Sequence, residues 1–114
     1  MNVKRALTLS ILALAAAYGA DPAEKADIWV MFYFGWKWKK GVKGAFDTFA
    51  CSYDLKRWTK WDGEPLVKPS EEYDGIHAHK PWVLKHDGVV YHWYCAVRKQ
   101  GGREVRGIAL ATSR

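Results

Sequence analysis

The chain has 114 residues, of which 49% are hydrophobic and 15% aromatic, and its formal net charge is +6. This length allows at most one small domain, and a lone sheet of such a size buries little apolar surface. The basic residues are few and scattered, which favours a solvated face over a nucleic-acid groove. Most aromatic residues lie in short runs beside β-branched neighbours, a pattern typical of strands, so an all-β chain is expected.

The N-terminal segment differs from the rest of the chain. Lys4 and Arg5 precede a short apolar stretch, and small residues follow it. This layout favours a helical secretory signal peptide over residues 1–20, cleaved after Gly19, and a secreted or periplasmic location for residues 21–114. The alternative is a buried N-terminal helix, because the stretch is too short to span a bilayer.

Two later stretches resemble each other at a constant offset. Tyr33 ends the run that begins at Ile28, and Tyr94 ends a similar run 61 residues further on (94 − 33). The serine-ended segments 50–52 and 111–113 match at the same offset. A fixed period of this size indicates a repeat architecture.

Each repeat is expected to be an antiparallel sheet. The first repeat, about 28–63, supplies predicted strands at Ile28 to Trp36, Ala45 to Ser52 and Arg57 to Trp61. The second, about 80–114, supplies Trp82 to His86, Val89 to Val97 and Gly107 to Ser113. Asp87-Gly88 between two apolar runs is a strong hairpin signal.

Both faces of the predicted strand at 89–96 are largely apolar. Val89, Tyr91 and Trp93 fall on one side, while Val90 and Tyr94 fall on the other. Such a strand needs cover above and below. Stacked propeller blades provide that cover, since each sheet lies between its neighbours. The two repeats are therefore expected to form about two blades, each lacking one strand.

The two cysteines leave one question open. Cys51 and Cys95 could form a disulfide in an exported protein. Each also lies in an apolar run, where a free cysteine behaves as a small hydrophobic residue, and this reading is favoured. Neither has the neighbours of a zinc site.

Residues 28–114 resemble the repeat of the five-bladed β-propeller glycoside hydrolases, the arabinanase-like group of families 43, 117 and 130. The motifs that carry the resemblance are Ala50 to Trp58, Pro65-Leu66, Lys80 to Val83, Asp87 to Tyr91 and Ile108 to Ser113. The resemblance implies an incomplete five-bladed propeller with a sugar site at one end of a central channel. It also implies acidic groups that act as base, orienting or pKa-tuning group, and acid.

The segment 73–81 is the expected site. Asp74 corresponds to an acidic residue that relatives place ahead of the Lys-Pro pair. His77 and His79, at alternate positions, would point the same way, and some relatives in family 117 are thought to use His as the acid. The alternatives are a turn-forming role for Asp74, before Gly75, and a metal site at the two histidines, which lacks a third ligand.

Further residues around this segment are candidates for binding sugar. Lys80 could bond a sugar hydroxyl or pair with a neighbouring glutamate. Trp82, Trp36 and Trp38 could stack on sugar rings or fill space between blades. Core packing is favoured for Trp58, Trp61 and Trp93, and His92 is expected to be a hydrogen-bonded core histidine.

The sequence thus predicts a fragment of a secreted glycoside hydrolase that cleaves a poly- or oligosaccharide by general acid/base catalysis. Asp74, His77 and His79 are the predicted catalytic residues, and no cofactor or metal is expected. The alternative is a carbohydrate-binding or interaction module without catalysis. No nucleic-acid partner or stable membrane span is expected, while self-association through open sheet edges is.

Overall fold

The computed structural model describes residues 3–5, 27–37 and 39–113. This part of the chain is built from strands and one short 3-10 helix, so the all-β prediction is confirmed. The elements, in chain order, are β1 (Val3–Arg5), β2 (Trp29–Trp36), β3 (Ala45–Ser52), β4 (Thr59–Lys60), η1 (Glu72–Asp74), β5 (His77–His86), β6 (Val89–Gln100) and β7 (Arg103–Ser113).

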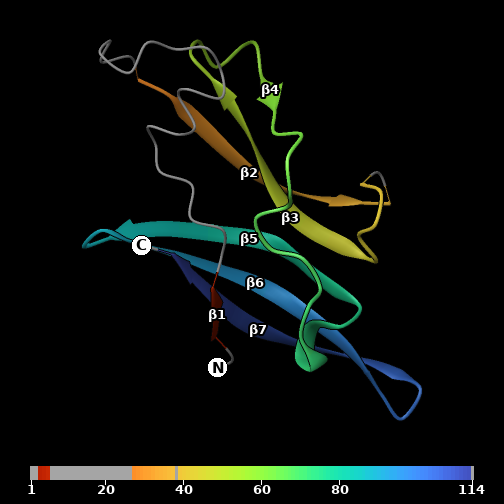
Figure 1. The fold of residues 1–114 in the computed structure, drawn as a ribbon. Helices are drawn as coiled ribbons and strands as arrows, with labels where there is room; N and C mark the ends of the chain where they lie inside the picture. The colour runs from red at the N-terminus through yellow and green to blue at the C-terminus, as the bar shows by residue number, and fades with distance from the viewer. Residues whose placement is uncertain (1–2, 6–26, 38, 114) are drawn as a thin grey trace.

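The strands form two sheets (Figure 1). One sheet has the order β2-β3-β4 and is antiparallel. The other has the order β1-β7-β6-β5, in which β1 runs parallel to β7 and the remaining pairs are antiparallel. The sheets meet where β2 and β3 cross β5, so β5 is the strand that joins the two halves of the molecule.

The two hairpins β2–β3 and β6–β7 have the same register. Trp29 pairs with Ser52, and Val90 pairs with Ser113, each 61 residues further along the chain (90 − 29 and 113 − 52). The offset read from the sequence is therefore present in the strand pairing itself. The backbone positions of Tyr33 and Tyr94 are equivalent in this register.

The strands of the second sheet are longer than predicted. The strand β5 was expected to begin at Trp82, but it begins at His77, and a register irregularity separates His79 from Trp82. Lys80 lies inside this irregularity with a φ of 64°. An extra residue in one strand of an antiparallel pair bends that strand and lets pairing continue beyond it, which a purely alternating pattern does not reveal.

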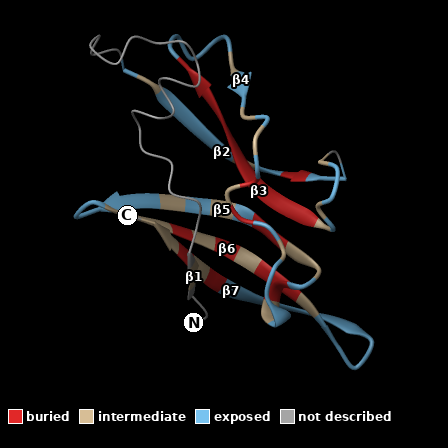
Figure 2. Ribbon diagram, in the orientation of Figure 1, coloured by how far each residue is buried: buried red, intermediate tan, exposed pale blue. Residues whose placement is uncertain are grey.

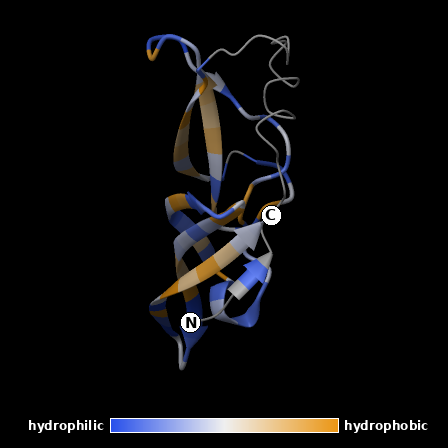
Figure 3. Ribbon diagram, turned by 90° about the vertical axis from the view of Figure 1, so that its left-hand side faces the viewer, coloured by the Kyte–Doolittle hydropathy of each residue, from blue (hydrophilic) through white to orange (hydrophobic). Residues whose placement is uncertain are grey.

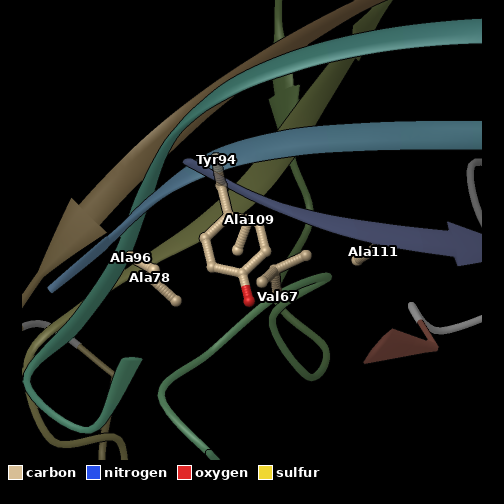
Figure 4. Packing of buried hydrophobic residues seen from close by; sticks show 6 residues of the cluster. All are labelled: Val67, Ala78, Tyr94, Ala96, Ala109 and Ala111. Carbon is tan, nitrogen blue, oxygen red and sulfur yellow. The ribbon is translucent and has the colours of Figure 1, made fainter. Parts of the chain in front are cut away.

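Burial is uneven between the strands (Figure 2). Every residue of β3 is buried, whereas β2 and β5 are mostly exposed or half-buried. One core cluster lies on β5, β6 and β7, where Tyr94 packs among alanines and Val67 from the loop before η1 (Figure 4). A fully buried large side chain contributes about 1.5–3 kcal/mol to folding. This cluster therefore holds the 65–75 loop against the sheet.

Several sequence predictions fall partly or wholly elsewhere. Most of the predicted signal-peptide helix, residues 6–20, lies outside the described residues. Cys51 and Cys95 are both free thiols. Among the helices in the described part of the chain, none is long and apolar enough to cross a bilayer.

Candidate active site

The predicted catalytic residues occupy two adjoining elements. Asp74 is the last residue of η1, and His77 and His79 are the first and third residues of β5. Gly44 allows the start of β3 to approach this segment, because a Cβ at Gly44 would lie 1.8 Å from the Ile76 carbonyl oxygen. Its φ of 81° is also in the region that favours glycine. The β3 backbone thus lies directly against the predicted site.

Asp74 is fully buried and saturated with hydrogen bonds. Its exposed fraction is 0%. Tyr94 Oη donates to Oδ2 at 2.7 Å, Lys4 Nζ donates to the same oxygen at 2.7 Å, and the backbone N–H groups of Ser70 and Glu71 donate to Oδ1. Burial works to raise the pKa of Asp74, but these hydrogen bonds outweigh it and hold the pKa below its ordinary value. Asp74 is therefore an ionised anchor of η1 in this arrangement.

Lys4 completes the environment of Asp74, and no sequence pattern indicated this contact. Its ammonium also donates to the Lys68 carbonyl and to Ser70 Oγ, and it lies 5.1 Å from the centre of the Tyr94 ring. Lys4 belongs to the segment predicted to be removed as a signal peptide. Cleavage there would leave Asp74 without its charge partner, though with its other donors.

His77 and His79 lie together at the start of β5. Their ring centroids are 5.4 Å apart, as expected from their alternate spacing. The Ala45 backbone N–H donates to His77 Nδ1 at 2.9 Å. The Nδ1 of His79 lies 3.3 Å from the Cys95 carbonyl, to which it can only donate. Each imidazole is held by a backbone group through its Nδ1.

These contacts give the two rings opposite roles at Nε2. A neutral His77 that accepts at Nδ1 carries its proton on Nε2, while a neutral His79 that donates from Nδ1 has an accepting Nε2. Burial, as the largest cause, lowers the pKa of His79 and so favours its neutral form. The pair can therefore offer one proton donor and one proton acceptor, as general acid/base chemistry requires.

Aromatic side chains of β2 flank the histidines. Phe34 meets the His79 ring edge-on at 5.4 Å, and Trp36 meets the His77 ring edge-on at 6.0 Å. Trp36 remains 56% exposed, and the Lys37 ammonium lies 4.6 Å from its ring centre. The structure thus brings Trp36 to the predicted site, whereas Trp38 lies outside the described residues.

The remaining predicted binding residues are exposed. Lys80 is exposed, and no ion pair between it and a neighbouring glutamate is present in the described part of the chain. Trp82 is 73% exposed and pairs across the sheet with Trp93. Of the tryptophans expected to fill space, Trp61 stacks on Phe49 at 5.5 Å, and Trp93 stacks on Tyr91 at 5.8 Å. Both are half-buried, as is Trp58.

A buried ion pair between the sheets was missed in part. His92 is a buried, hydrogen-bonded histidine, as predicted, but its partner Asp47 was not identified. His92 Nε2 lies 2.8 Å from Asp47 Oδ2, whereas Asp47 Oδ1 is buried without a hydrogen-bond partner among the described residues. Burial raises the pKa of Asp47 to about 6, against the lowering effect of His92. The available signal was an aspartate amid the apolar residues of β3.

The described residues contain no group of three potential metal-ligating side chains. The chemistry that this arrangement supports on its own is proton transfer at the two imidazoles. It is flanked by one aromatic face and by a backbone irregularity at Lys80.

The chain is similar to two solved structures. One is named "Glycoside hydrolase", with 54% identity over 77% of this chain and a TM-score of 0.67. The other is named as an RGII complex of BT0996, with 55% identity over 77% of this chain and a TM-score of 0.68. No protein-family model and no curated protein matches the chain. The chain spans 24% of the length of each solved relative. Over most of its own length, it has a glycoside hydrolase-like relationship.

Proposed function

We propose that the chain is part of a secreted or periplasmic glycoside hydrolase and forms about two blades of a five-bladed propeller. The observation that carries the proposal is the 54% identity to a structure named as a glycoside hydrolase. The repeated hairpin register supports the blade arrangement, because stacked sheets of one pattern are the basis of a propeller.

The proposed site centres on His77 and His79. The two imidazoles lie side by side with opposite Nε2 roles, and Trp36 presents an exposed aromatic face beside them. Lys80 has a left-handed backbone conformation, a kind of strain that is common at binding sites. We assign proton transfer to the histidines, sugar stacking to Trp36 and a hydroxyl contact to Lys80. Asp74 would act indirectly, by fixing η1 ahead of β5.

The test is a chimera, because the chain spans 24% of its solved relatives. Residues 27–113 replace the matching segment of the solved glycoside hydrolase, and hydrolysis is followed by release of reducing sugar. The substrates are a panel of oligosaccharides that includes RGII, the molecule in the name of the second relative. The chimera is expected to hydrolyse the substrate of its parent.

Single substitutions then locate the site. His79→Ala and His77→Ala are each expected to lower kcat about 100-fold or more, the usual contribution of a general acid or base. His86→Ala, at the exposed far end of the same strand, is the matched control and should leave kcat unchanged. Unchanged rates in both site variants would remove the histidines from catalysis. Binding by calorimetry without turnover, in a chimera whose parent is active, would favour a carbohydrate-binding module.

A further inference from the structure

The outer face of the β5-β6-β7 sheet is apolar, and its side chains are exposed in the described part of the chain. Trp82, Trp93 and Leu110 form one row across the three strands, and Ile108 and Leu84 flank it. Ile108 is 65% exposed and Leu84 53%. A contiguous exposed apolar patch of this kind marks an interaction site. We call the following residues the Trp93 face: Trp82, Leu84, Tyr91, Trp93, Ile108 and Leu110.

We infer that the Trp93 face binds a second copy of this chain, head to tail. The repeat itself supports this inference. Residues of β2 at alternate positions pack on the second sheet, where Phe32 meets His92 edge-on at 6.3 Å and Phe34 meets His79. Through the offset of 61, Phe32 corresponds to Trp93. The Trp93 face is thus the counterpart of the face with which the first hairpin packs inside the molecule.

The same offset identifies the surface that the second copy would contribute. In the first hairpin, the counterparts of His92 and Tyr94 are Met31 and Tyr33. Met31 is 42% exposed and its neighbour Trp29 on the same face is 49% exposed. We call Trp29, Met31 and Tyr33 the Met31 face. Hydrophobic residues lie along the strands of both sheets (Figure 3).

Tyr33 shows that the Met31 face is unfinished. Its hydroxyl is buried without a hydrogen-bond partner among the described residues, whereas the hydroxyl of its counterpart Tyr94 donates to Asp74 at 2.7 Å. A buried polar group without a partner is rare in a completed structure. Both faces therefore lack in one copy what their counterparts have within the chain.

The contact is heterologous, because two different surfaces meet. It differs from pairing at open sheet edges, since side-chain faces rather than backbone groups are joined. The inference does not rest on the proposed sugar-cleaving function. It assigns the exposed Trp82 to the contact between copies.

The experiment measures the mass of the full chain by light scattering during size-exclusion chromatography. Wild type is expected to give at least twice the 13.0 kDa monomer mass. Ile108→Asp is expected to give the monomer mass, because the carboxylate would face Met31 of the next copy, without the histidine that Asp47 has. Leu84→Asp tests the same face, and Leu55→Asp, on an exposed loop, is the control that keeps the wild-type mass.

Mixing two variants distinguishes head-to-tail contact from a symmetric one. Met31→Asp is also expected to be monomeric, but an equimolar mixture with Ile108→Asp retains one intact contact and should give a dimer. Circular dichroism checks that each variant is folded. A monomeric wild type, a mass that neither Ile108→Asp nor Leu84→Asp lowers, or a mixture that stays monomeric would overturn the inference.

Discussion

The hairpins β2–β3 and β6–β7 share one backbone register but differ in their surroundings. Tyr94 is 1% exposed and donates to a buried carboxylate, whereas its counterpart Tyr33 is half-buried and its hydroxyl has no partner within the described ranges. The 65–75 loop covers the second hairpin through Val67 and Asp74. A repeated strand pattern therefore sets the pairing, while each copy acquires its stability from the segment that packs on it.

The connections within the two hairpins also differ. The second ladder continues past the repeat and closes at Gly101 and Gly102, both with positive φ. That is the backbone demanded by a type I′ turn, which matches the strand twist. The equivalent segment of the first hairpin, residues 37–44, leaves the ladder after Trp36. Two adjacent glycines are present only in the second connection.

Breaking the polar anchor of the second hairpin should have the strongest effect on stability. Asp74→Asn should lower the free energy of unfolding by about 3–5 kcal/mol, since it leaves the largely buried Lys4 ammonium without a countercharge. Urea unfolding measures the change. Glu64→Gln, which removes an exposed pair with Lys68, is the control and should cause no measurable change. Equal effects of the two variants would contradict the anchor role.

A pH series sharpens the contrast between the sheets. The pKa of folded Asp47 is about 6, above its ordinary value of 3.8, so the folded protein binds this proton more tightly than the unfolded chain. As pH rises from about 4 to 6, this group should therefore lower stability, by roughly 2–3 kcal/mol in total. The pKa of Asp74 is lowered, so Asp74 stabilises the fold above the unfolded pKa and loses that contribution in acid.

Urea unfolding at several pH values in this window measures the Asp47 contribution. The Asp47→Asn variant lacks the titrating group and should show a flatter pH dependence than wild type. Asp54→Asn, an exposed loop carboxylate, is the control and should keep the wild-type slope between pH 4 and 6. Parallel curves for wild type and Asp47→Asn would show that Asp47 titrates normally.

Removing one hydroxyl from each hairpin tests their equivalence directly. Tyr94→Phe should cost about 1.5–3 kcal/mol, because it removes a hydrogen bond to a charged group. Tyr33→Phe should be neutral or slightly stabilising, because its hydroxyl is buried with no hydrogen-bond partner in the described part of the chain. Thermal and urea unfolding of both variants provide the comparison. Similar losses at the two positions would mean that Tyr33 also has a stabilising partner.

A weaker effect is expected at the turn of the second hairpin. Gly102→Ala places a side chain at a φ of 77° and should cost about 1–2 kcal/mol. Gly107→Ala, in β7 with open space around its Cβ, is the matched control and should be neutral or stabilising. Unfolding by urea distinguishes them. A neutral Gly102→Ala would indicate that the turn relaxes to another type.

Sequence reasoning identified the strands and the repeat well, and the partners of polar residues poorly. Alternation and the Asp87-Gly88 turn predicted the β5–β6 hairpin, but the bulge at Lys80 hid the true start of β5. His77 and His79 were predicted to lie together, and they do, because alternate residues of a strand share a side. Their opposite hydrogen-bond roles depend on Ala45 and Cys95, which no local pattern could indicate.

Strand content and the offset of 61 could be read from the amino-acid order alone, because strand alternation and turn chemistry are local properties. The pairing of Lys4 with Asp74 and of Asp47 with His92 became visible only in the folded chain. These partners lie far apart in the sequence and meet through the angle at which one sheet crosses the other. That angle is set by the packing of whole faces, and so the ionisation of both buried carboxylates is a property of the assembled sheets.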